Sequence, residues 1–250
     1  MKKVLDIQGL TKRYKNGRGV GDISFSIGEG EILGILGPNG SGKTTVMKSI
    51  MGFCRYDSGN IRVFEHDPRE NKEAALAHVG SLIESPALYE NMTAKRQLKM
   101  MARLYPDLPP TAVENALKDV GLEQYANEKV RRFSLGMKQR LGIAMAFLSK
   151  PELVILDEPT NGLDIESSVE LRNRIVKMAK RDKRSFLVSG HNADEIEKMC
   201  DRVVIIYEGQ LVDDITVEEA LRLSPTLEDY FLMRVRDEKD HFVPKGGASR

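Results

Sequence analysis

The chain has 250 residues, of which 41% are hydrophobic and 30% are charged, and 38 Lys and Arg balance 37 Asp and Glu. The formal net charge of +1 argues against a protein held to nucleic acid by bulk charge. The longest apolar run, residues 141–148, is far shorter than the roughly 18 residues that a membrane span needs. The first residues lack the apolar stretch of a signal peptide, and Cys54 and Cys200 have neither disulfide nor metal-ligand spacing. We therefore expect a soluble, cytosolic chain.

Strand-like patterns dominate the first 84 residues. Residues 23–27 alternate apolar and polar side chains, as in a half-exposed antiparallel strand. Residues 32–36 form a continuous apolar run, which is typical of a buried parallel strand. Residues 44–51 then have the pattern of a helix, and residues 61–64 and 81–83 that of short strands.

The periodicity becomes helical between residues 85 and 150. Ala94 and Leu98 share one face of a predicted helix, because residues four apart lie above one another. Further along, Thr111 and Glu114 have the spacing of a capping box, in which each side chain bonds the other residue's backbone N–H. We expect this stretch to form an all-helical insert.

Strand character returns after residue 150. Strands are predicted at residues 153–156, 185–189, 202–207 and 210–212, and helices at residues 165–181 and 193–199. Glu208-Gly209 indicates a hairpin, and Thr216 with Glu219 has the spacing of a second capping box. The predicted organisation is a core at 1–84 and 151–215, a helical insert at 85–150, C-terminal helices at 216–236 and a polar tail at 237–250, which we expect to be disordered.

A phosphate-binding loop follows the buried strand at residues 32–36. Residues 37–44 fit G-x-x-x-x-G-K-[ST] at every position, between a strand and a helix as the motif requires. Backbone N–H groups of such a loop turn toward one centre, Lys43 can reach the β- and γ-phosphates, and the Thr44 hydroxyl can ligate Mg²⁺. A glycine-rich turn that happens to hold a lysine is the alternative. The predicted phosphate-binding residues are Gly37, Pro38, Asn39, Gly40, Ser41, Gly42, Lys43, Thr44 and Thr45.

Two carboxylates follow the apolar run at residues 153–156. Asp157 would emerge at the C-terminal edge of a buried parallel strand, where ligands of α/β sheets bind. We expect Asp157 to hold Mg²⁺ through water, and Glu158 to be the base that orients or deprotonates an attacking water. The alternative is an ordinary acidic loop start before Pro159.

These features together resemble the ATP-binding subunits of ABC transporters, over about residues 3–232. The phosphate loop, Asp157-Glu158, the helical insert, residues 161–164 and His191 occur in that family's order. The resemblance implies an α/β P-loop NTPase (RecA-like) fold with a mixed-sheet core, an N-terminal antiparallel β subdomain and an inserted α-helical subdomain. It also implies ATP and Mg²⁺ as cofactors and ATP hydrolysis as the reaction.

Three single residues gain a role from the resemblance. Tyr14 matches an aromatic that stacks on adenine, although it could also be a surface tyrosine in a basic turn. His191 matches a histidine that contacts the γ-phosphate, and its role depends on its position, since a lone histidine is usually a surface or core residue. Asp164 matches a loop that crosses a dimer interface, but it could equally cap the helix that follows.

A nucleotide-contacting signature is expected at the start of the third insert helix. The family's common form is Leu-Ser-Gly-Gly-Gln, and Ser134 and Gly136 keep the sense of that pattern. Leu135 and Met137 depart from it. The resemblance implies that Ser134 and Gly136 contact the ATP of an opposite subunit, whereas a plain N-cap before an amphipathic helix is the alternative.

Glu84 occupies the position at which the family normally has a glutamine that senses Mg²⁺ and the γ-phosphate. A carboxylate is a hard oxygen ligand for Mg²⁺. Glutamate here, followed by Ser-Pro-Ala-Leu-Tyr, resembles the branch that exports bacitracin-like peptides, lantibiotics and other drugs and often confers self-immunity, and residues 226–231 also look like that branch. Glu84 could instead be a solvated loop acid without a metal role.

The function implied by the resemblance is an ATP-hydrolysing subunit that powers export of an antibiotic, lantibiotic or similar amphipathic drug. The implied partners are a separate transmembrane permease subunit of the ABC-2-like kind and a second ATPase copy, as a homodimer or pseudo-dimer in the ATP-bound state, with no nucleic acid. The implied location is the cytoplasmic face of the membrane.

The alternatives are other ATPase classes. A DNA-repair or chromosome-organising head would need a long coiled coil between phosphate loop and signature, and residues 45–133 are too short and show no sustained heptads. A ribosome-acting protein of the family would carry two cassettes in one chain. A GTPase would carry Asn-Lys-x-Asp, which residues 71–74 fail at the fourth position. An ABC-type ATPase with a regulatory or sensing role not coupled to transport remains the alternative.

Overall fold

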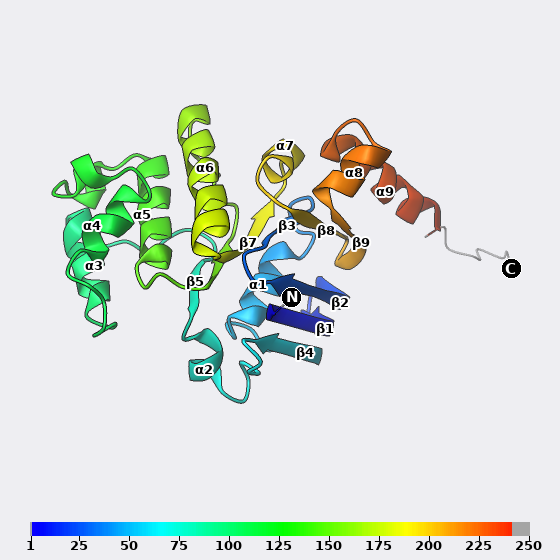
Figure 1. The fold of residues 1–250 in the computed structure, drawn as a ribbon. Helices are drawn as coiled ribbons and strands as arrows, with labels where there is room; N and C mark the ends of the chain where they lie inside the picture. The colour runs from blue at the N-terminus through cyan, green and yellow to red at the C-terminus, as the bar shows by residue number, and fades with distance from the viewer. Residues whose placement is uncertain (1, 242–250) are drawn as a thin grey trace, which may run out of the picture.

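A small antiparallel sheet and a larger mixed sheet form the centre of the molecule (Figure 1). This computed structural model describes residues 2–241. The small sheet has the order β2-β1-β4, and all its pairs are antiparallel. Its strands are β1 (Lys3–Arg13), β2 (Gly19–Gly28) and β4 (Ser58–Val63). The apolar and polar alternation of residues 23–27 thus predicts β2 correctly.

The six-stranded sheet has the order β5-β6-β7-β3-β8-β9. Its pairs are parallel except that of β8 with β9, which is a hairpin as Glu208-Gly209 predicts. Its strands are β3 (Ile32–Leu36), β5 (Val79–Leu82), β6 (Leu153–Leu156), β7 (Ser185–Gly190), β8 (Arg202–Tyr207) and β9 (Gln210–Thr216). Because the inner strands are parallel, their carboxyl ends meet at one edge, and the loops that follow β3, β6 and β7 lie together there.

Helices cover the sheet and form both ends of the molecule. The segment between β5 and β6 is helical and lies at one end, and α8 and α9 lie at the other (Figure 1). The helices are α1 (Lys43–Ile50), α2 (Lys72–Leu76), α3 (Ala94–Ala102), α4 (Ala112–Lys118), α5 (Leu135–Phe147), α6 (Ile165–Asp182), α7 (Ala193–Glu197), α8 (Val217–Leu223) and α9 (Leu227–His241), with short 3-10 turns at η1 (Glu123–Tyr125) and η2 (Val130–Arg132).

The larger sheet separates two apolar cores. Alternate residues of a strand point to opposite faces, so Ile32 of β3 joins one core and Leu33 the other. The first core contains the insert helices, α6 and α9, and the second contains α1 and the small sheet. Since both faces are covered, β3 and β6 are buried at every position, which explains their continuous apolar sequences.

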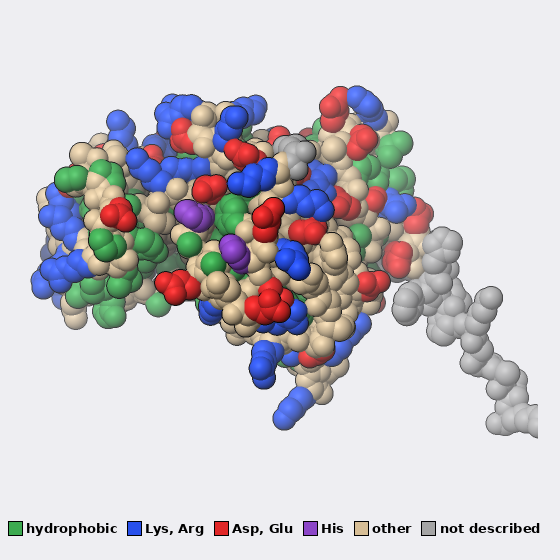
Figure 2. All heavy atoms as spheres, turned by 60° about the horizontal axis from the view of Figure 1, so that its bottom comes forward, with side chains coloured by type: hydrophobic (Ala, Val, Ile, Leu, Met, Phe, Trp, Pro, Cys, Tyr) green, Lys and Arg blue, Asp and Glu red, His purple; other side chains and the backbone are tan. Residues whose placement is uncertain are grey.

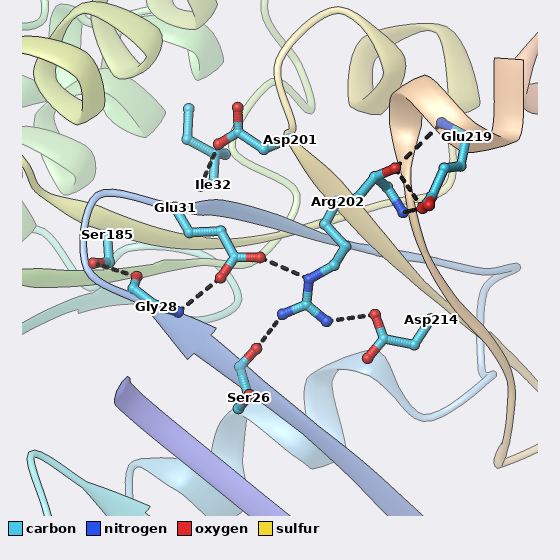
Figure 3. A network of polar contacts seen from close by, with 10 residues as sticks. Ser26, Gly28, Glu31, Ile32, Ser185, Asp201, Arg202, Asp214 and Glu219 are labelled. Atoms are coloured by element: carbon cyan, nitrogen blue, oxygen red, sulfur yellow. Dashed lines mark hydrogen bonds and ion pairs between the residues drawn. The ribbon is translucent and has the colours of Figure 1, made fainter. Parts of the chain in front are cut away.

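An arginine at the start of β8 joins the two sheets (Figure 3). The Arg202 Nε donates to Glu31 Oε1 at 2.7 Å, and its two terminal nitrogens donate to Asp214 and to the Ser26 carbonyl. The Gly28 N–H donates to the second oxygen of Glu31 at 2.7 Å. The network therefore fixes the end of β2 against β8 and β9, and so fixes the small sheet relative to the loops at the site.

Two predictions about termini of helices are wrong. Thr111 does not cap α4, because its ψ of 0° is helical rather than extended and its side chain accepts no capping hydrogen bond. Its intended partner, Glu114, pairs with Lys95 at 2.8 Å. The disordered tail was expected from residue 237, yet α9 continues to His241, and Arg234 pairs with Asp237 at 3.7 Å. The rest of the predicted tail, 242–250, lies outside the described residues.

Candidate active site

The loop between β3 and α1 has a backbone that only glycine allows at two points. Gly42 has φ of 112°, and a Cβ there would lie 2.3 Å from Val20 Cγ1. A Cβ on Gly37 would lie 2.2 Å from the carbonyl oxygen of Ile206. The loop therefore turns tightly against β2 and β8 and leads into the N-terminus of α1, where backbone N–H groups can face an anionic ligand.

The loop closes around the lysine that the motif identifies. Lys43 is 5% exposed, and its Nζ donates to the carbonyls of Gly37 at 2.8 Å and Pro38 at 3.1 Å. Within residues 2–241, Ser41 Oγ is buried without a hydrogen-bond partner. A cation and an unsatisfied hydroxyl at the centre of a glycine loop fit a bound phosphate, which would accept hydrogen bonds from both.

Asp157 is held at the carboxyl end of β6 by two hydroxyls. Thr44 Oγ1 donates to Asp157 Oδ2 at 2.8 Å, and Ser189 Oγ donates to Oδ1 at 2.5 Å. Asp157 is 8% exposed, so its carboxylate is fixed and largely shielded. A hydroxyl and a carboxylate in contact are hard oxygen donors that fit Mg²⁺, so Thr44 and Asp157 would hold it. Ser189, the penultimate residue of the neighbouring strand β7, was not identified from the sequence, where no local motif marks it.

Glu158 lies between a lysine and a histidine. Its Oε1 is 3.6 Å from Lys43 Nζ, and its Oε2 is 3.2 Å from His191 Nδ1. Its backbone has φ of 46°, a left-handed conformation that costs a non-glycine residue about 1 kcal/mol. Its N–H donates to Ser189 Oγ at 3.0 Å, which holds that turn. The structure thus brings together Glu158, His191 and Lys43.

A cavity of about 390 Å³ opens on the phosphate loop. Tyr14 lines it with 39% of its surface exposed, and Lys12 Nζ lies 5.4 Å from the ring centre. Asn16 and Arg18 also line it, and neither was identified from the sequence. Both belong to the loop between β1 and β2 that carries Tyr14, so their proximity to Tyr14 in the chain was the available signal. The cavity offers an aromatic face at one side and phosphate donors at the other.

Glu84 contacts the helix that follows the phosphate loop. Its Oε1 lies 2.5 Å from Lys48 Nζ, and this hydrogen bond raises the pKa of Lys48. Lys48 is one helical turn after Thr44, so the two side chains lie on the same side of α1. Glu84 therefore pairs with a residue that lies one helical turn after Thr44.

Ser134, Gly136 and Asp164 form a second group outside the cavity. Ser134 Oγ accepts the Met137 N–H at 3.2 Å and caps α5. Asp164 caps α6 by accepting the Ser167 N–H at 2.8 Å, and this hydrogen bond lowers the pKa of Asp164. A Cβ on Gly136 would lie 3.1 Å from the Gly162 carbonyl oxygen, so the first turn of α5 packs on the loop before α6. The capping roles are thus present for both Ser134 and Asp164.

The arrangement supports phosphoryl transfer to water. Backbone N–H groups and Lys43 would neutralise phosphate oxygens, which is the main requirement of that chemistry. Glu158 can take a proton from a water at its carboxylate, and His191 can orient that carboxylate or the phosphate. A second cavity of about 160 Å³, lined by Glu158 and His191, opens beside them.

Comparison with known proteins gives one consistent result. The family model described as ABC transporter matches residues 20–161. The chain is 40% identical to the bacitracin transport ATP-binding protein BcrA of Bacillus licheniformis over 86% of this chain and 70% of that protein. It is 36% identical to the lantibiotic transport ATP-binding protein SrtF of Streptococcus pyogenes over 94% and 99%. A solved ATP-binding subunit of an ABC transporter superposes with a TM-score of 0.83, at 28% identity, over 93% of this chain and 99% of that one. Within residues 2–241, no helix is both long and apolar enough to cross a membrane.

Proposed function

Because this chain belongs to the ABC transporter family and is an ATP-binding, ATP-hydrolysing subunit of a transporter, we propose that it powers export of an antibiotic, a lantibiotic or a similar amphipathic drug through a separate membrane subunit. The observation that carries the hydrolytic part is Glu158, held between Lys43 and His191 beside the phosphate loop. The names of the bacitracin and lantibiotic relatives, both above 35% identity, support the cargo class.

The proposed mechanism assigns a task to each residue of the site. Lys43 leaves the carbonyls of its own loop to donate to the β- and γ-phosphates, and Tyr14 stacks on the adenine. Mg²⁺, held by Thr44 and Asp157, would neutralise charge on the phosphate oxygens. Glu158 accepts the proton of the attacking water, and His191 holds the γ-phosphate end in place.

Glu84 is proposed as a further residue that reaches the metal end of the site. Its carboxylate pairs with Lys48, which lies one helical turn after Thr44. A change of the Glu84 side-chain rotamer would move the carboxylate from Lys48 toward the metal that Thr44 would hold. Lys48 offsets the extra negative charge that glutamate brings beside a triphosphate. Glu84 would thus report nucleotide occupancy to the segment after β5.

A second copy of the chain is proposed to complete each site. Ser134, at the N-terminus of α5, would donate to the γ-phosphate bound by the other copy, and Asp164 would lie in the same interface. Two apolar side chains flank these residues in an exposed position: Leu135 is 71% exposed and Ile165 is 86% exposed. Burial of such side chains between two copies would stabilise the closed state, which ATP then favours because it binds both halves.

The membrane subunit is proposed to dock near the helical insert. Hydrophobic side chains gather at the end of the molecule that carries the insert (Figure 2). Tyr89 is 59% exposed, yet the buried side chain of Gln97 bonds both its N–H and its carbonyl, at 3.0 and 3.2 Å. An exposed aromatic side chain on a backbone fixed in this way, five residues after Glu84, is suited to a protein partner, since aromatic anchors dominate such interfaces.

The test is a resistance assay with the membrane subunit present. Cells that express both chains should tolerate more bacitracin or lantibiotic than cells with either chain alone. The Glu158→Gln variant should lose that gain, whereas Glu123→Gln, at an exposed surface position, should keep it. Full resistance with Glu158→Gln would overturn coupling to hydrolysis and favour the regulatory alternative.

A further inference from the structure

A groove of about 860 Å³ lies at the opposite edge of the large sheet from the phosphate loop. Residues 150–152, which precede β6, and residues 183–184, which precede β7, form its floor, and α4 and α6 form its walls. Because the nucleotide site lies at the carboxyl ends of the same parallel strands, the groove is a separate site.

The groove is strongly basic. Seven of its lining residues are Lys or Arg and three are Asp or Glu, an excess of four positive charges, although the chain as a whole is nearly neutral. Two of the cations are neutralised, because Arg174 pairs with Glu170 at 2.5 Å and Arg181 pairs with Asp182 at 2.7 Å. The cations without a carboxylate within 4.0 Å in the described part of the chain are Lys118, Lys150, Lys177, Lys183 and Arg184.

Arg184 is the unusual member of this set. It is only 9% exposed, and the one hydrogen-bond contact of its guanidinium within residues 2–241 is Met178 Sδ at 3.5 Å. The pKa of Asp182 is lowered by its hydrogen bond with Arg181 and, to a lesser extent, by the positive charge of Arg184, but no described carboxylate lies within 4.0 Å of Arg184. Burying a guanidinium without a directly bonded anion costs free energy. Here the guanidinium lines the groove.

The dipole of α6 explains some of these charges but not Arg184. Cations near the carboxyl end of a helix are stabilised by its partial negative charge, which accounts for Lys177 and Arg181 at the surface. That effect is worth little, acts on exposed side chains and gives no reason to bury a guanidinium at the start of β7. A ligand that supplies negative charge inside the groove does give such a reason.

We propose that the groove binds a soluble oligophosphate, with Arg184 at its floor. Several cations around one hollow favour an anion that carries several charges, and the planar guanidinium matches pairs of phosphate oxygens. No aromatic side chain is among the described residues that line the groove, so it offers no surface for stacking a base. The recognised chemistry is therefore the phosphate chain. The ligand spans the loops before β6 and β7 and so bridges the carboxyl ends of α5 and α6.

The test uses inorganic tripolyphosphate and the full chain carrying Lys43→Ala, which disables the phosphate loop. Titration calorimetry at physiological salt should show one site. Adding Arg184→Met should lower the affinity at least about tenfold, since it removes a charge-assisted hydrogen bond. Adding Lys150→Gln and Lys177→Gln should lower it similarly. Lys99→Gln with Arg103→Gln, two exposed cations of the α3 segment, is the matched control and should not change it.

Urea unfolding separates binding from folding. Tripolyphosphate should raise the unfolding midpoint of the Lys43→Ala chain and of the control. It should not raise the midpoint after Arg184→Met, while the midpoint without tripolyphosphate should be equal or higher, because an apolar side chain replaces a buried charge. If Arg184→Met does not fold, the affinity of the variant with Lys150→Gln and Lys177→Gln tests the proposal instead. Absence of binding to the Lys43→Ala chain, or equal binding by all variants, would overturn the proposal.

Discussion

The two groups of site residues differ in how they are held. In the phosphate-loop half, each functional side chain contacts another: Thr44 bonds Asp157, and Glu158 lies between Lys43 and His191. In the half that contains Ser134 and Asp164, the hydrogen bonds of each side chain within residues 2–241 go to the first turn of its own helix. The side chains of the first half are thus already assembled around the phosphate loop, whereas those of the second lie beside the exposed apolar side chains of Leu135 and Ile165. The contrast supports the proposal that nucleotide binding needs one copy and hydrolysis needs two.

The largest expected effect is a difference in ATP affinity between a variant of the phosphate-loop half and a variant of the Ser134 half. Lys43→Ala removes a cation that would donate to two phosphates, so ATP affinity should fall roughly 100-fold or more. Ser134→Ala should leave the affinity of the isolated chain within about twofold. Fluorescent-nucleotide titration at low protein concentration measures both. A comparable loss for Ser134→Ala would mean that the second half already contacts nucleotide in a single copy.

Two helix N-caps, Ser134 and Thr216, allow the same comparison to be made with the ATPase rate. Ser134 and Thr216 each accept an N–H at 3.2 Å at a helix N-terminus, so either alanine variant should cost about 1 kcal/mol of stability. Only Ser134→Ala should lower the maximal ATPase rate, by roughly 10- to 100-fold, because it also removes a phosphate donor. Equal rates for the two variants would reduce Ser134 to a cap.

Glu84 should have a smaller effect that belongs to the phosphate-loop half. Glu84→Gln keeps the shape but removes the charge that pairs with Lys48, so the Mg²⁺ concentration for half-maximal ATPase should shift several-fold, on the order of 1 kcal/mol. Lys48→Gln is the companion variant, because it leaves Glu84 unpaired and should shift the dependence the other way. An unchanged Mg²⁺ dependence in both variants would remove Glu84 from the metal site.

The smallest expected effect is on stability alone and concerns Tyr230, which belongs to neither half of the site. Burial, together with the hydrogen bond that the hydroxyl donates to Asp213 at 2.5 Å, raises the pKa of Tyr230 to about 12 from 10.0. A raised folded-state pKa means that this stabilisation is present below pH 10 and is lost as the pH rises toward 12. Tyr230→Phe should lose about 1 kcal/mol near neutral pH and flatten the fall of unfolding free energy above pH 10. Nucleotide binding should stay unchanged. If the unfolding free energy of Tyr230→Phe fell as steeply above pH 10 as that of the unmodified chain, other groups would account for the pH dependence.

The phosphate loop, Asp157 and Glu158 could be predicted because each follows a strand within a few residues and depends on local backbone geometry. Ser189 could not, since it reaches Asp157 from the neighbouring strand β7 through a contact that only the folded sheet creates. Arg18 was not identified either, and its only sequence signal was its closeness to Tyr14. Thr216 caps its helix as its sequence pattern predicts, but Thr111 does not, because the turn that joins the Pro109 carbonyl to the Ala112 N–H holds it in a helical conformation.

Two of the missed segments are short or polar. Helix α2 spans only Lys72–Leu76 and buries Ala75 alone, so it has no periodic apolar face to detect. The last turns of α9 carry mainly charged side chains, which in sequence resemble a solvated tail. Apolar periodicity reveals a helix only where one of its faces is apolar, and neither segment has such a face in its sequence.

The Glu158→Gln variant tests the central claim, that hydrolysis needs two copies, most directly. The substitution removes the proposed base but keeps the side chain beside Lys43 and His191, so turnover should fall at least about 100-fold. Light scattering after gel filtration should then give twice the mass of the chain with ATP and Mg²⁺, and the single-chain mass with ADP. A variant that hydrolyses ATP at the normal rate, or that stays monomeric with bound ATP, would contradict the account.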